Sequence, residues 1–398
     1  MSNIYPKLRN VNSNSNWQTA TLGDVVKEYK VSNKLIHHQN LLSLSYGKIV
    51  SKDIESKKGL LPASFDTYQI IKEDIIVFRV TDLQNDKKSL RVGISSQEGI
   101  ITPAYVCVEC NNKQISPKYL FTLLHYYDSI TKVMYKMGDG LRQTLSYREL
   151  KDLVIYIPSI NEQHYITDVF EEIDSYINIG NKKLASLKKI KEASLQAMFP
   201  QEGETVPRVR FKGFEGEWKE TKAAQIFQTT NERNFPKLPV LSATQDKGMV
   251  TRDSIGYNIF HDKSNEATYK HILPGQFVIH LRSFQGGFAH SSIEGICSPA
   301  YTIMEFKDKE ANFDLYWKYV LTSKQFVKSL EMITYGIRDG RTISFDEFKE
   351  MRFLVPQIEE QQKIASYFVA LDKQITLQTQ RLEKLKQIKA ACLDKMFV

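Results

Sequence analysis

The sequence predicts an α+β protein in which two mixed α/β globular domains are separated by two long antiparallel helices. Two observations lead to this prediction. The segment that begins at Pro158 recurs at Pro356 and keeps one register, at an offset of 198 residues, to the endings Met198-Phe199 and Met396-Phe397. Short β-rich runs fill the segments in front of both copies. A tandem duplication with a pseudo-two-fold internal repeat accounts for both features.

The segments before the two copies are expected to be globular. Apolar runs at residues 75–78 and 277–280 predict strands, whereas residues 119–127 and 315–321 predict helices. Glycines between such runs mark turns. Each segment is therefore interpreted as a mixed α/β domain, with no predicted strand order.

Each copy of the repeat predicts one long helix. Its apolar residues follow one another in alternating steps of four and three, which keeps them on one face and is typical of a coiled coil. This seam consists of Ile166, Phe170, Ile173, Ile177, Leu184 and Leu187 in the first copy and Ile364, Phe368, Leu371, Ile375, Leu382 and Leu385 in the second. Residues 162–198 would form about 55 Å of helix, and an apolar seam of that length needs a partner. The other copy is the nearest one, and chain connectivity makes the pair antiparallel.

The predicted organisation has four parts. Residues 1–158 and 200–356 form the two globular domains. Residues 159–199 form a central spacer helix, and residues 357–398 form a C-terminal spacer helix.

Composition narrows the class of protein. Hydrophobic residues make up 42% and charged residues 25% of the 398 residues, so each domain can bury a core. The 54 Lys and Arg exceed the 46 Asp and Glu, which favours a polyanionic partner without proving one. Four cysteines form no disulfide framework, and no apolar run of about 18 residues could span a membrane. We expect a cytoplasmic protein that does not associate with membranes.

Signatures of catalysis are weak or missing in the sequence. It has no Gly-x4-Gly-Lys-Ser/Thr phosphate loop and no Asn-Pro-Pro or Asp-Pro-Pro segment of an amino-methyltransferase. Glu149 and Glu347 resemble half of a nuclease site, but each lies three residues after a serine, in the Ser-x-x-Glu pattern of a capping box. Both glutamates are therefore expected at helix starts. The chain is predicted to be non-enzymatic, with an independent nuclease as a less favoured alternative.

Two groups of residues have metal-binding chemistry. Cys107 and Cys110 have ligand spacing, but no second Cys or His pair follows them, so they are interpreted as core residues. The second domain also contains a series of histidines without counterparts in the first: His261, His271, His280 and His290. Their spacing does not favour ligation, and no metal site is predicted.

Polar residues at matched places in the two domains are the candidates for DNA contacts. An arginine can form two hydrogen bonds with a guanine edge, glutamine can do so with adenine, and hydroxyls can bind phosphates or base edges. The candidates follow glycine turns (Arg142, Gln143, Arg338, Arg341), end apolar strands (Arg79, Arg282) or lie in corresponding loops (Ser43, Ser45, Ser242, Thr244). Most basic residues of the two helices are interpreted as a solvated outer face.

Scaffold residues agree between the two domains, whereas the residues between them differ. Two readers that share a frame but not their loops would select two different half-sites. The predicted target is therefore bipartite and asymmetric, with its halves close to one DNA turn, about 34 Å, apart.

In several motifs the chain resembles the DNA-specificity subunit of type I restriction–modification systems. These motifs are the Pro-x-x-x-Glu-Gln helix starts at Pro158 and Pro356, the Leu-x-x-Leu-Lys-x-Ile-Lys stretches from Leu184 and Leu382, and the Met-Phe endings. A further motif, Pro-Arg-Val-Arg-Phe-Lys-Gly-Phe-Glu-Gly-Glu-Trp, begins at Pro207. Of this last motif the first domain keeps only Pro6, Leu8, Arg9 and Trp17.

The resemblance implies two target-recognition domains that each read half of a double-stranded DNA target. It also implies paired helices that set the spacing and dock two methyltransferase subunits, with restriction/translocase subunits in the full complex. S-adenosylmethionine, ATP and magnesium would belong to those partners, so no cofactor is expected in this chain. The alternative is a coiled-coil structural adaptor without DNA specificity, which explains the helices and the charge but not the shared scaffold with different loops.

Overall fold

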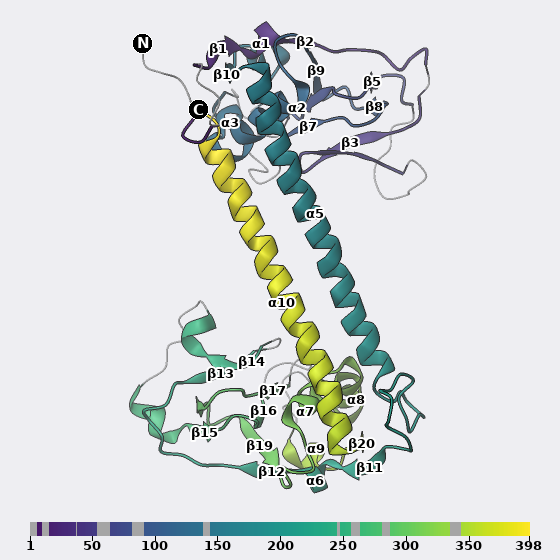
Figure 1. Cartoon of the computed structure of the whole chain (residues 1–398), viewed down its shortest axis with the longest axis vertical. Coiled ribbons are helices and arrows are strands. Elements are labelled where there is room, and N and C mark those ends of the chain that lie inside the picture. Colours follow the sequence, from purple (N-terminus) through teal and green to yellow (C-terminus); the bar gives the residue numbers. More distant parts are fainter. Residues whose placement is uncertain are drawn as a thin grey trace. The chain divides into compact units, whose positions relative to one another are not determined.

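The computed structural model describes residues 6–9, 16–36, 38–53, 64–81, 91–137, 144–244, 247–255, 263–280, 287–334 and 344–398. The chain divides into two compact units: unit 1 comprises Met1–Lys182 and Thr379–Val398, and unit 2 comprises Lys183–Gln378. The two longest helices, α5 (Ile160–Ala197) and α10 (Ile358–Lys395), each contribute residues to both units (Figure 1).

Unit 1 consists of short strands and short helices around its parts of α5 and α10. Before α5 its elements are β1 (Gln18–Thr21), α1 (Leu22–Val25), β2 (Val26–Glu28), β3 (Leu42–Ser45), β4 (Lys48–Ser51), β5 (Gln69–Ile71), β6 (Ile76–Phe78), β7 (Val92–Ile94), β8 (Gly99–Ile101), β9 (Val106–Cys110), α2 (Pro117–Tyr126), the π-helix η1 (Tyr127–Thr131), α3 (Val133–Met137), α4 (Tyr147–Leu150) and β10 (Val154–Ile157).

Unit 2 repeats this sequence of elements with small changes. Before α10 they are β11 (Lys219–Lys222), α6 (Ala223–Ile226), β12 (Phe227–Thr230), β13 (Leu241–Thr244), β14 (Gly248–Thr251), the 3-10 helices η2 (Arg252–Ile255) and η3 (Lys263–Thr268), β15 (Lys270–Ile272), β16 (Phe277–Ile279), β17 (Phe288–His290), β18 (Gly295–Cys297), β19 (Thr302–Phe306), α7 (Asp314–Leu321), α8 (Lys324–Thr334), α9 (Phe345–Phe348) and β20 (Arg352–Val355).

The described strands pair in the same way in both units. Unit 1 has a four-stranded antiparallel sheet in the order β2-β9-β6-β7, and unit 2 has the order β12-β19-β16-β17. Two-stranded pairs complete each unit: β1-β10, β3-β4 and β5-β8 in unit 1, and β11-β20, β13-β14 and β15-β18 in unit 2. The first and last strands of each unit pair with each other, so the chain enters each unit beside the strand that leads into a long helix.

The core of unit 1 combines residues from the N-terminal part of the chain with residues at the end of α10. The Phe397 ring stacks on Phe170 of α5, with centroids 6.1 Å apart, and on Tyr126 of α2, 5.3 Å away. It also meets Trp17 edge-on at 6.5 Å. The backbone N–H of Leu8 donates to the carbonyl of Lys395 at 2.8 Å, which ties the first described segment to the end of α10.

The core of unit 2 is built in the same way around the end of α5. The Phe199 ring stacks on Phe368 of α10 at 6.1 Å, meets Trp218 edge-on at 6.3 Å and lies 5.7 Å from Tyr316. The N–H of Val209 donates to the carbonyl of Ala197 at 2.9 Å. Each unit therefore encloses the aromatic end of a long helix that begins in the other half of the sequence.

Within each unit, the parts of α5 and α10 are also joined by polar contacts. In unit 1 the Lys389 ammonium lies 2.7 and 2.9 Å from the two carboxylate oxygens of Asp174. In unit 2 the Lys191 ammonium lies 2.5 Å from Asp372, whose other oxygen accepts a hydrogen bond from Tyr319 at 2.8 Å. The two ion pairs join equivalent positions of the repeat, with the lysine and the aspartate exchanged between the helices.

The start of each long helix carries a buried carboxylate that is paired with an arginine. The Arg9 guanidinium binds both oxygens of Glu162 at 2.9 and 2.8 Å, and Arg210 binds Glu360 at 2.7 and 2.8 Å. The bidentate geometry is the strong form of this interaction, and it satisfies a carboxylate that is withdrawn from water.

A glutamine next to each buried carboxylate joins the helix start to the preceding loops. In unit 1 the Gln163 side chain accepts from the N–H of Ser116 at 2.8 Å and donates to the carbonyl of Pro158 at 3.0 Å. Gln361 makes the equivalent bonds in unit 2, with the N–H of Phe313 at 2.9 Å and the carbonyl of Pro356 at 3.0 Å. The repeated Glu-Gln pair of the sequence thus holds together separate segments of each unit.

The prediction of a mixed α/β fold is confirmed. The apolar runs at 75–78 and 277–280 contain β6 and β16. The helix predicted at 119–127 is α2, which continues into the π-helix η1, and that at 315–321 is α7. All twelve seam positions of α5 and α10 are buried or half-buried. The capping boxes are present, since Ser146 and Ser344 accept from the N–H of Glu149 and Glu347, whose carboxylates accept from the serines.

Replacing Arg210 with alanine is expected to destabilise unit 2 by about 3–5 kcal/mol, because it leaves a buried carboxylate unpaired. The Glu360 side chain is only 1% exposed. The matched control is Arg208→Ala, which removes an ion pair with Glu204 from an arginine that is 66% exposed and should cost less than about 1 kcal/mol. Urea unfolding of the full chain measures both changes. Equal losses for the two variants would contradict the structural role of the buried pair.

Candidate nucleic-acid interface

Half of the sequence-predicted contact residues lie in the described part of the chain. Arg142, Gln143, Arg282, Arg338 and Arg341 fall outside the described residues. The remaining five are Arg79, Ser43, Ser45, Ser242 and Thr244.

The hydroxyl residues lie in two equivalent hairpins, and their assignment to loops was wrong. Ser43 and Ser45 belong to β3, while Ser242 and Thr244 belong to β13. In each case a strand of alternating apolar and hydroxyl residues pairs with the next strand. Because side chains alternate across a strand, the hydroxyls share the face opposite to the buried leucines.

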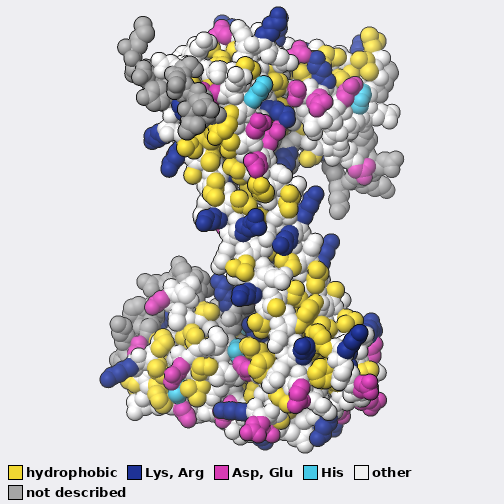
Figure 2. Space-filling view, viewed as in Figure 1, with side chains coloured by type: hydrophobic (Ala, Val, Ile, Leu, Met, Phe, Trp, Pro, Cys, Tyr) yellow, Lys and Arg dark blue, Asp and Glu magenta, His cyan; other side chains and the backbone are white. Residues whose placement is uncertain are grey.

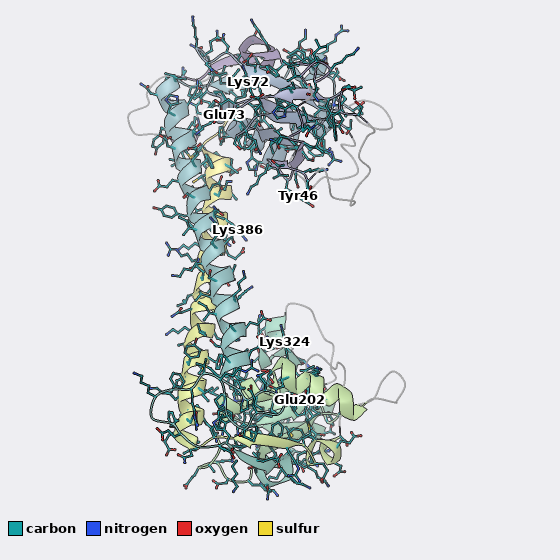
Figure 3. The ribbon with its side chains drawn as sticks, turned by 90° about the vertical axis from the view of Figure 1, so that its right-hand side faces the viewer. Tyr46, Lys72, Glu73, Glu202, Lys324 and Lys386 are labelled. Atoms are coloured by element: carbon teal, nitrogen blue, oxygen red, sulfur yellow. The ribbon has the colours of Figure 1, made fainter. Side chains whose placement is uncertain are left out.

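In the β3–β4 hairpin the polar face is open. Leu42, Leu44 and Ile49 pack in the core, whereas Ser45 and Lys48 are paired across the strands and exposed. A two-residue turn, Tyr46-Gly47, joins the strands, and both residues have positive φ (48° and 77°). The Tyr46 side chain is 73% exposed. Figure 3 shows it at the edge of unit 1, directed away from the core.

Neither the β3–β4 hairpin nor Tyr46 at its turn was predicted from the sequence, although the sequence contains a pattern that indicates the hairpin. Two runs of alternating residues, Leu-Ser-Leu-Ser and Lys-Ile-Val-Ser, flank a dipeptide that ends in glycine. That pattern is typical of a tight hairpin. The tyrosine at the first turn position hid it, since asparagine, aspartate or glycine is usual there.

In the β13–β14 hairpin the hydroxyls serve the fold. Ser242 is buried, and its Oγ accepts from the Arg252 guanidinium at 3.1 Å. The Thr244 hydroxyl donates to the carbonyl of Gly248 at 2.8 Å and accepts from the N–H of Lys247 at 3.2 Å, which closes the end of the hairpin. These bonds leave neither hydroxyl as available for a ligand as Ser45 in unit 1.

Arg79 directly follows β6, as predicted, and lies beside a buried arginine that the sequence did not single out. The backbone N–H of Arg79 donates to the carbonyl of this buried residue, Arg91, at 2.8 Å. Arg91 is almost fully buried; its guanidinium donates to the carbonyl of Thr81 at 2.7 Å, and its N–H donates to the Asp128 carboxylate of the π-helix η1. Burial raises the pKa of Asp128 against the opposing effect of these donors. This network holds the end of β6, and with it Arg79, in place.

Charge is mixed over the visible surface of each unit. Figure 2 shows Lys and Arg side chains interspersed with Asp and Glu, and basic side chains along the exposed stretches of the long helices. Most of the lysines of α5 and α10 are exposed, as predicted, but Lys191 and Lys389 are half-buried and form the ion pairs described above. On the face that Figure 2 shows, the described Lys and Arg side chains therefore form no continuous basic patch.

Three residues with metal-binding chemistry, Cys107, Cys110 and His290, have structural roles in the described part of the chain. Cys107 and Cys110 are buried, and burial raises the pKa of each thiol to about 12. His290 Nε2 lies 2.8 Å from the Asp314 carboxylate, and this hydrogen bond lowers the pKa of Asp314. Within the described ranges no cluster of three or more potential ligands could hold a metal ion. His261 falls outside those ranges.

His271 joins three segments of unit 2. It is 6% exposed; its Nδ1 lies 3.0 Å from Glu232, its Nε2 lies 2.9 Å from Glu294, and its ring stacks on Phe235 at 3.9 Å. Burial lowers the pKa of His271, but the two carboxylates outweigh it, so the pKa is raised overall. A ring with a carboxylate at each nitrogen donates both bonds when it is protonated.

The equivalent residue in unit 1 carries no charge. Strand pairing aligns His271 and Ile296 with Ile70 and Ile100. Ile70 and Ile100 form an apolar cluster with Leu41. The same place in the frame is therefore held by an ionic contact in unit 2 and by apolar packing in unit 1.

Raising the pH should remove the contribution of His271 to the stability of unit 2. Its pKa is raised in the folded state, so the stabilisation is complete below the unfolded value, near 6.5, and is lost as the pH passes through the folded value. The melting temperature of the wild type should fall relative to that of His271→Gln as the pH rises above about 6.5. A difference that stays constant as the pH rises would show that the fold does not raise the pKa of His271.

Glu149 and Glu347 resemble half of a nuclease site in the sequence. In the structure their carboxylates cap the starts of α4 and α9. The Glu149 carboxylate accepts from the N–H and the hydroxyl of Ser146 at 2.7 Å each, and these bonds lower its pKa. Glu347 makes the same two bonds to Ser344 at 3.0 Å.

In the part of the chain that the structure covers, no helix has the length and apolar character to cross a membrane.

Comparison with known proteins agrees with the sequence resemblance. Residues 215–387 match the family model of the type I restriction modification DNA specificity domain. The type I restriction enzyme MjaVIII specificity subunit of Methanocaldococcus jannaschii is 22% identical over 399 aligned residues, which cover 95% of this chain and 91% of that protein.

Solved structures share the fold. The type I restriction-modification system S subunit from M. genitalium superposes with a TM-score of 0.61 at 15% identity, covering 99% of both chains. A chain from a study of complex assembly and conformational transition of the type I R-M system gives a TM-score of 0.50 at 15% identity, over 98% of this chain and 99% of that one. In its sequence motifs, in the family model over residues 215–387 and in its fold, the chain is similar to the specificity subunits of type I restriction–modification systems.

Proposed function

We propose that the chain is a non-catalytic subunit that selects a bipartite, asymmetric DNA sequence, with residues 1–158 reading one half and residues 200–356 reading the other. Residues 159–199 and 357–398 would form one antiparallel pair of helices that sets the spacing. Two methyltransferase subunits would dock on this pair, and restriction/translocase subunits would join in the full complex. S-adenosylmethionine, ATP and magnesium would be bound by these partners, in the cytoplasm.

The observation that carries this proposal is the contrast between a shared frame and different surfaces. The two units share their strand order, their Arg–Glu pair and their buried Phe at equivalent places. Their hairpins differ, since β3–β4 ends in the open Tyr46-Gly47 turn and β13–β14 has a longer connection with engaged hydroxyls. A structural adaptor would need the frame but gives no reason for the surfaces to differ.

The exchanged ion pairs support the proposed arrangement of the helices. Lys191–Asp372 and Lys389–Asp174 are related by the offset of the repeat, with donor and acceptor helices interchanged. Reciprocal contacts of this kind, in which i meets j and j meets i, are the mark of a two-fold relation. They favour one continuous antiparallel pair with a pseudo-two-fold axis, which would present its two methyltransferase sites equivalently.

Exchanging residues 200–356 for the second domain of another specificity subunit should change one half of the modified sequence and leave the other half intact. The reason is that the frame contacts lie inside each unit, so the surfaces can be replaced without altering the other reader. Methylome sequencing of a host that carries the hybrid subunit with its methyltransferase measures the outcome. A change in both halves would contradict independent reading.

Binding by the complex with the methyltransferase subunits should be specific and strongly salt-dependent. Phosphate contacts release counterions, so affinity for the duplex identified by the methylome should fall about a thousandfold between about 50 and 200 mM salt. A duplex of the same composition with one half-site scrambled serves as the control in gel-shift titration. Equal affinity for the two duplexes would favour the structural adaptor instead.

A further inference from the structure

We propose that Tyr46, at the tip of the β3–β4 hairpin, contacts the target DNA and contributes to the selectivity of the first half-site. This inference rests on the proposed function and adds a residue to it. Its contact atoms are the ring and the hydroxyl, which suit a base edge or sugar and a phosphate respectively.

The first argument is the backbone conformation of Tyr46. A two-residue connection with positive φ at both positions is a type I′ turn, which strongly favours Asn-Gly, Asp-Gly or Gly-Gly. Four non-glycine residues in the described part of the chain have positive φ: Tyr46, Asp74, Lys132 and Asn234. Asp and Asn tolerate this region, but an aromatic residue gains nothing from it. A disfavoured conformation held by the surrounding structure motivates a functional explanation.

The second argument is that the tyrosine does not support the fold. Its side chain is exposed and makes no hydrogen bond or ring contact with another described residue. The hairpin beneath it is held by other residues: a Cβ added at Gly93 of β7 would come within 2.5 Å of Leu44 and 3.1 Å of Ile49. The hairpin therefore packs closely against β7, and this packing fixes the position of the turn that carries Tyr46.

The third argument is the chemistry around the tip. Ser45 and Lys48 flank the turn, are both exposed and lie opposite each other across the strands. Between Leu42 and Ser51 there is one cation and no acidic residue. A hydroxyl, an ammonium and an aromatic ring on a narrow projection suit a polyanion with stacked bases. A protein partner would need a wider apolar area, and the outer face of this hairpin offers only Val50.

The test uses the whole complex with its methyltransferase subunits and compares Tyr46→Asn, Tyr46→Phe and Lys48→Ala with the wild type. Tyr46→Asn is chosen because asparagine suits a type I′ turn, so the melting temperature should be equal to or above that of the wild type. Its affinity for the methylome-defined duplex should nevertheless fall about 5- to 150-fold, or the modified sequence should relax within one half-site. The half read by unit 2 is the internal control and should not change.

The other two variants separate the atoms involved. Tyr46→Phe should keep the selectivity if the ring makes the contact and lose affinity if the hydroxyl binds a phosphate. Lys48→Ala should weaken binding to all duplexes by a similar factor. It should also reduce the salt dependence of binding by about one phosphate contact.

A Tyr46→Asn complex that assembles normally and keeps wild-type affinity and an unchanged modified sequence would overturn the inference while leaving the proposed function intact. A Tyr46→Asn complex that loses its methyltransferase subunits would also overturn it, by assigning the tip to protein assembly. A wild-type complex that shows no preference among duplexes would refute the proposed function, and this inference with it.

Discussion

The structure depends on one constraint: neither half of the sequence contains a complete core for its own unit. Unit 1 needs Phe397, which comes from the last residues of the second half, and unit 2 needs Phe199, which comes from the end of the first. Each ring is enclosed by aromatic and helix residues of the unit that receives it, and burying an aromatic side chain is among the largest single contributions to a core. The long helices are therefore parts of both cores as well as connections between them.

This constraint explains why the repeat is so visible in the sequence at the helices and so faint in the globular segments. A residue that joins separate segments of one unit must satisfy distant neighbours, as Glu162 and Glu360 do with their arginines. Gln163 and Gln361 each bind backbone groups from separate segments. Substitution there would leave buried polar groups unpaired, which is costly. The exposed residues Ser45 and Lys48 on the outer face of the β3–β4 hairpin carry no such burden, so they are free to differ.

Sequence patterns predicted the parts of the fold that arise from local spacing and could not predict those that join distant segments. The long helices and the capping boxes follow from periodicity and from a serine three residues before a glutamate. The strand order could not be predicted, because short apolar strands pair by tertiary packing rather than by local signal. His271 and Arg91 were not recognised as structural centres for the same reason: their partners Glu232, Glu294 and Asp128 lie 23 to 39 residues away in the sequence.

The comparison of His271 with Ile70 shows how far the units can diverge while keeping one frame. The same strand position is held by two carboxylates in one unit and by apolar packing in the other, so the frame constrains geometry rather than chemistry. Residues that carry selectivity should then satisfy two conditions: they differ between the units, and the fold of their own unit does not need them. Ser242 and Thr244 fail the second condition because their hydroxyls hold the β13–β14 hairpin together. Tyr46 meets both, since it has an unfavourable backbone conformation, lies in the open and replaces a residue that would have served the turn better.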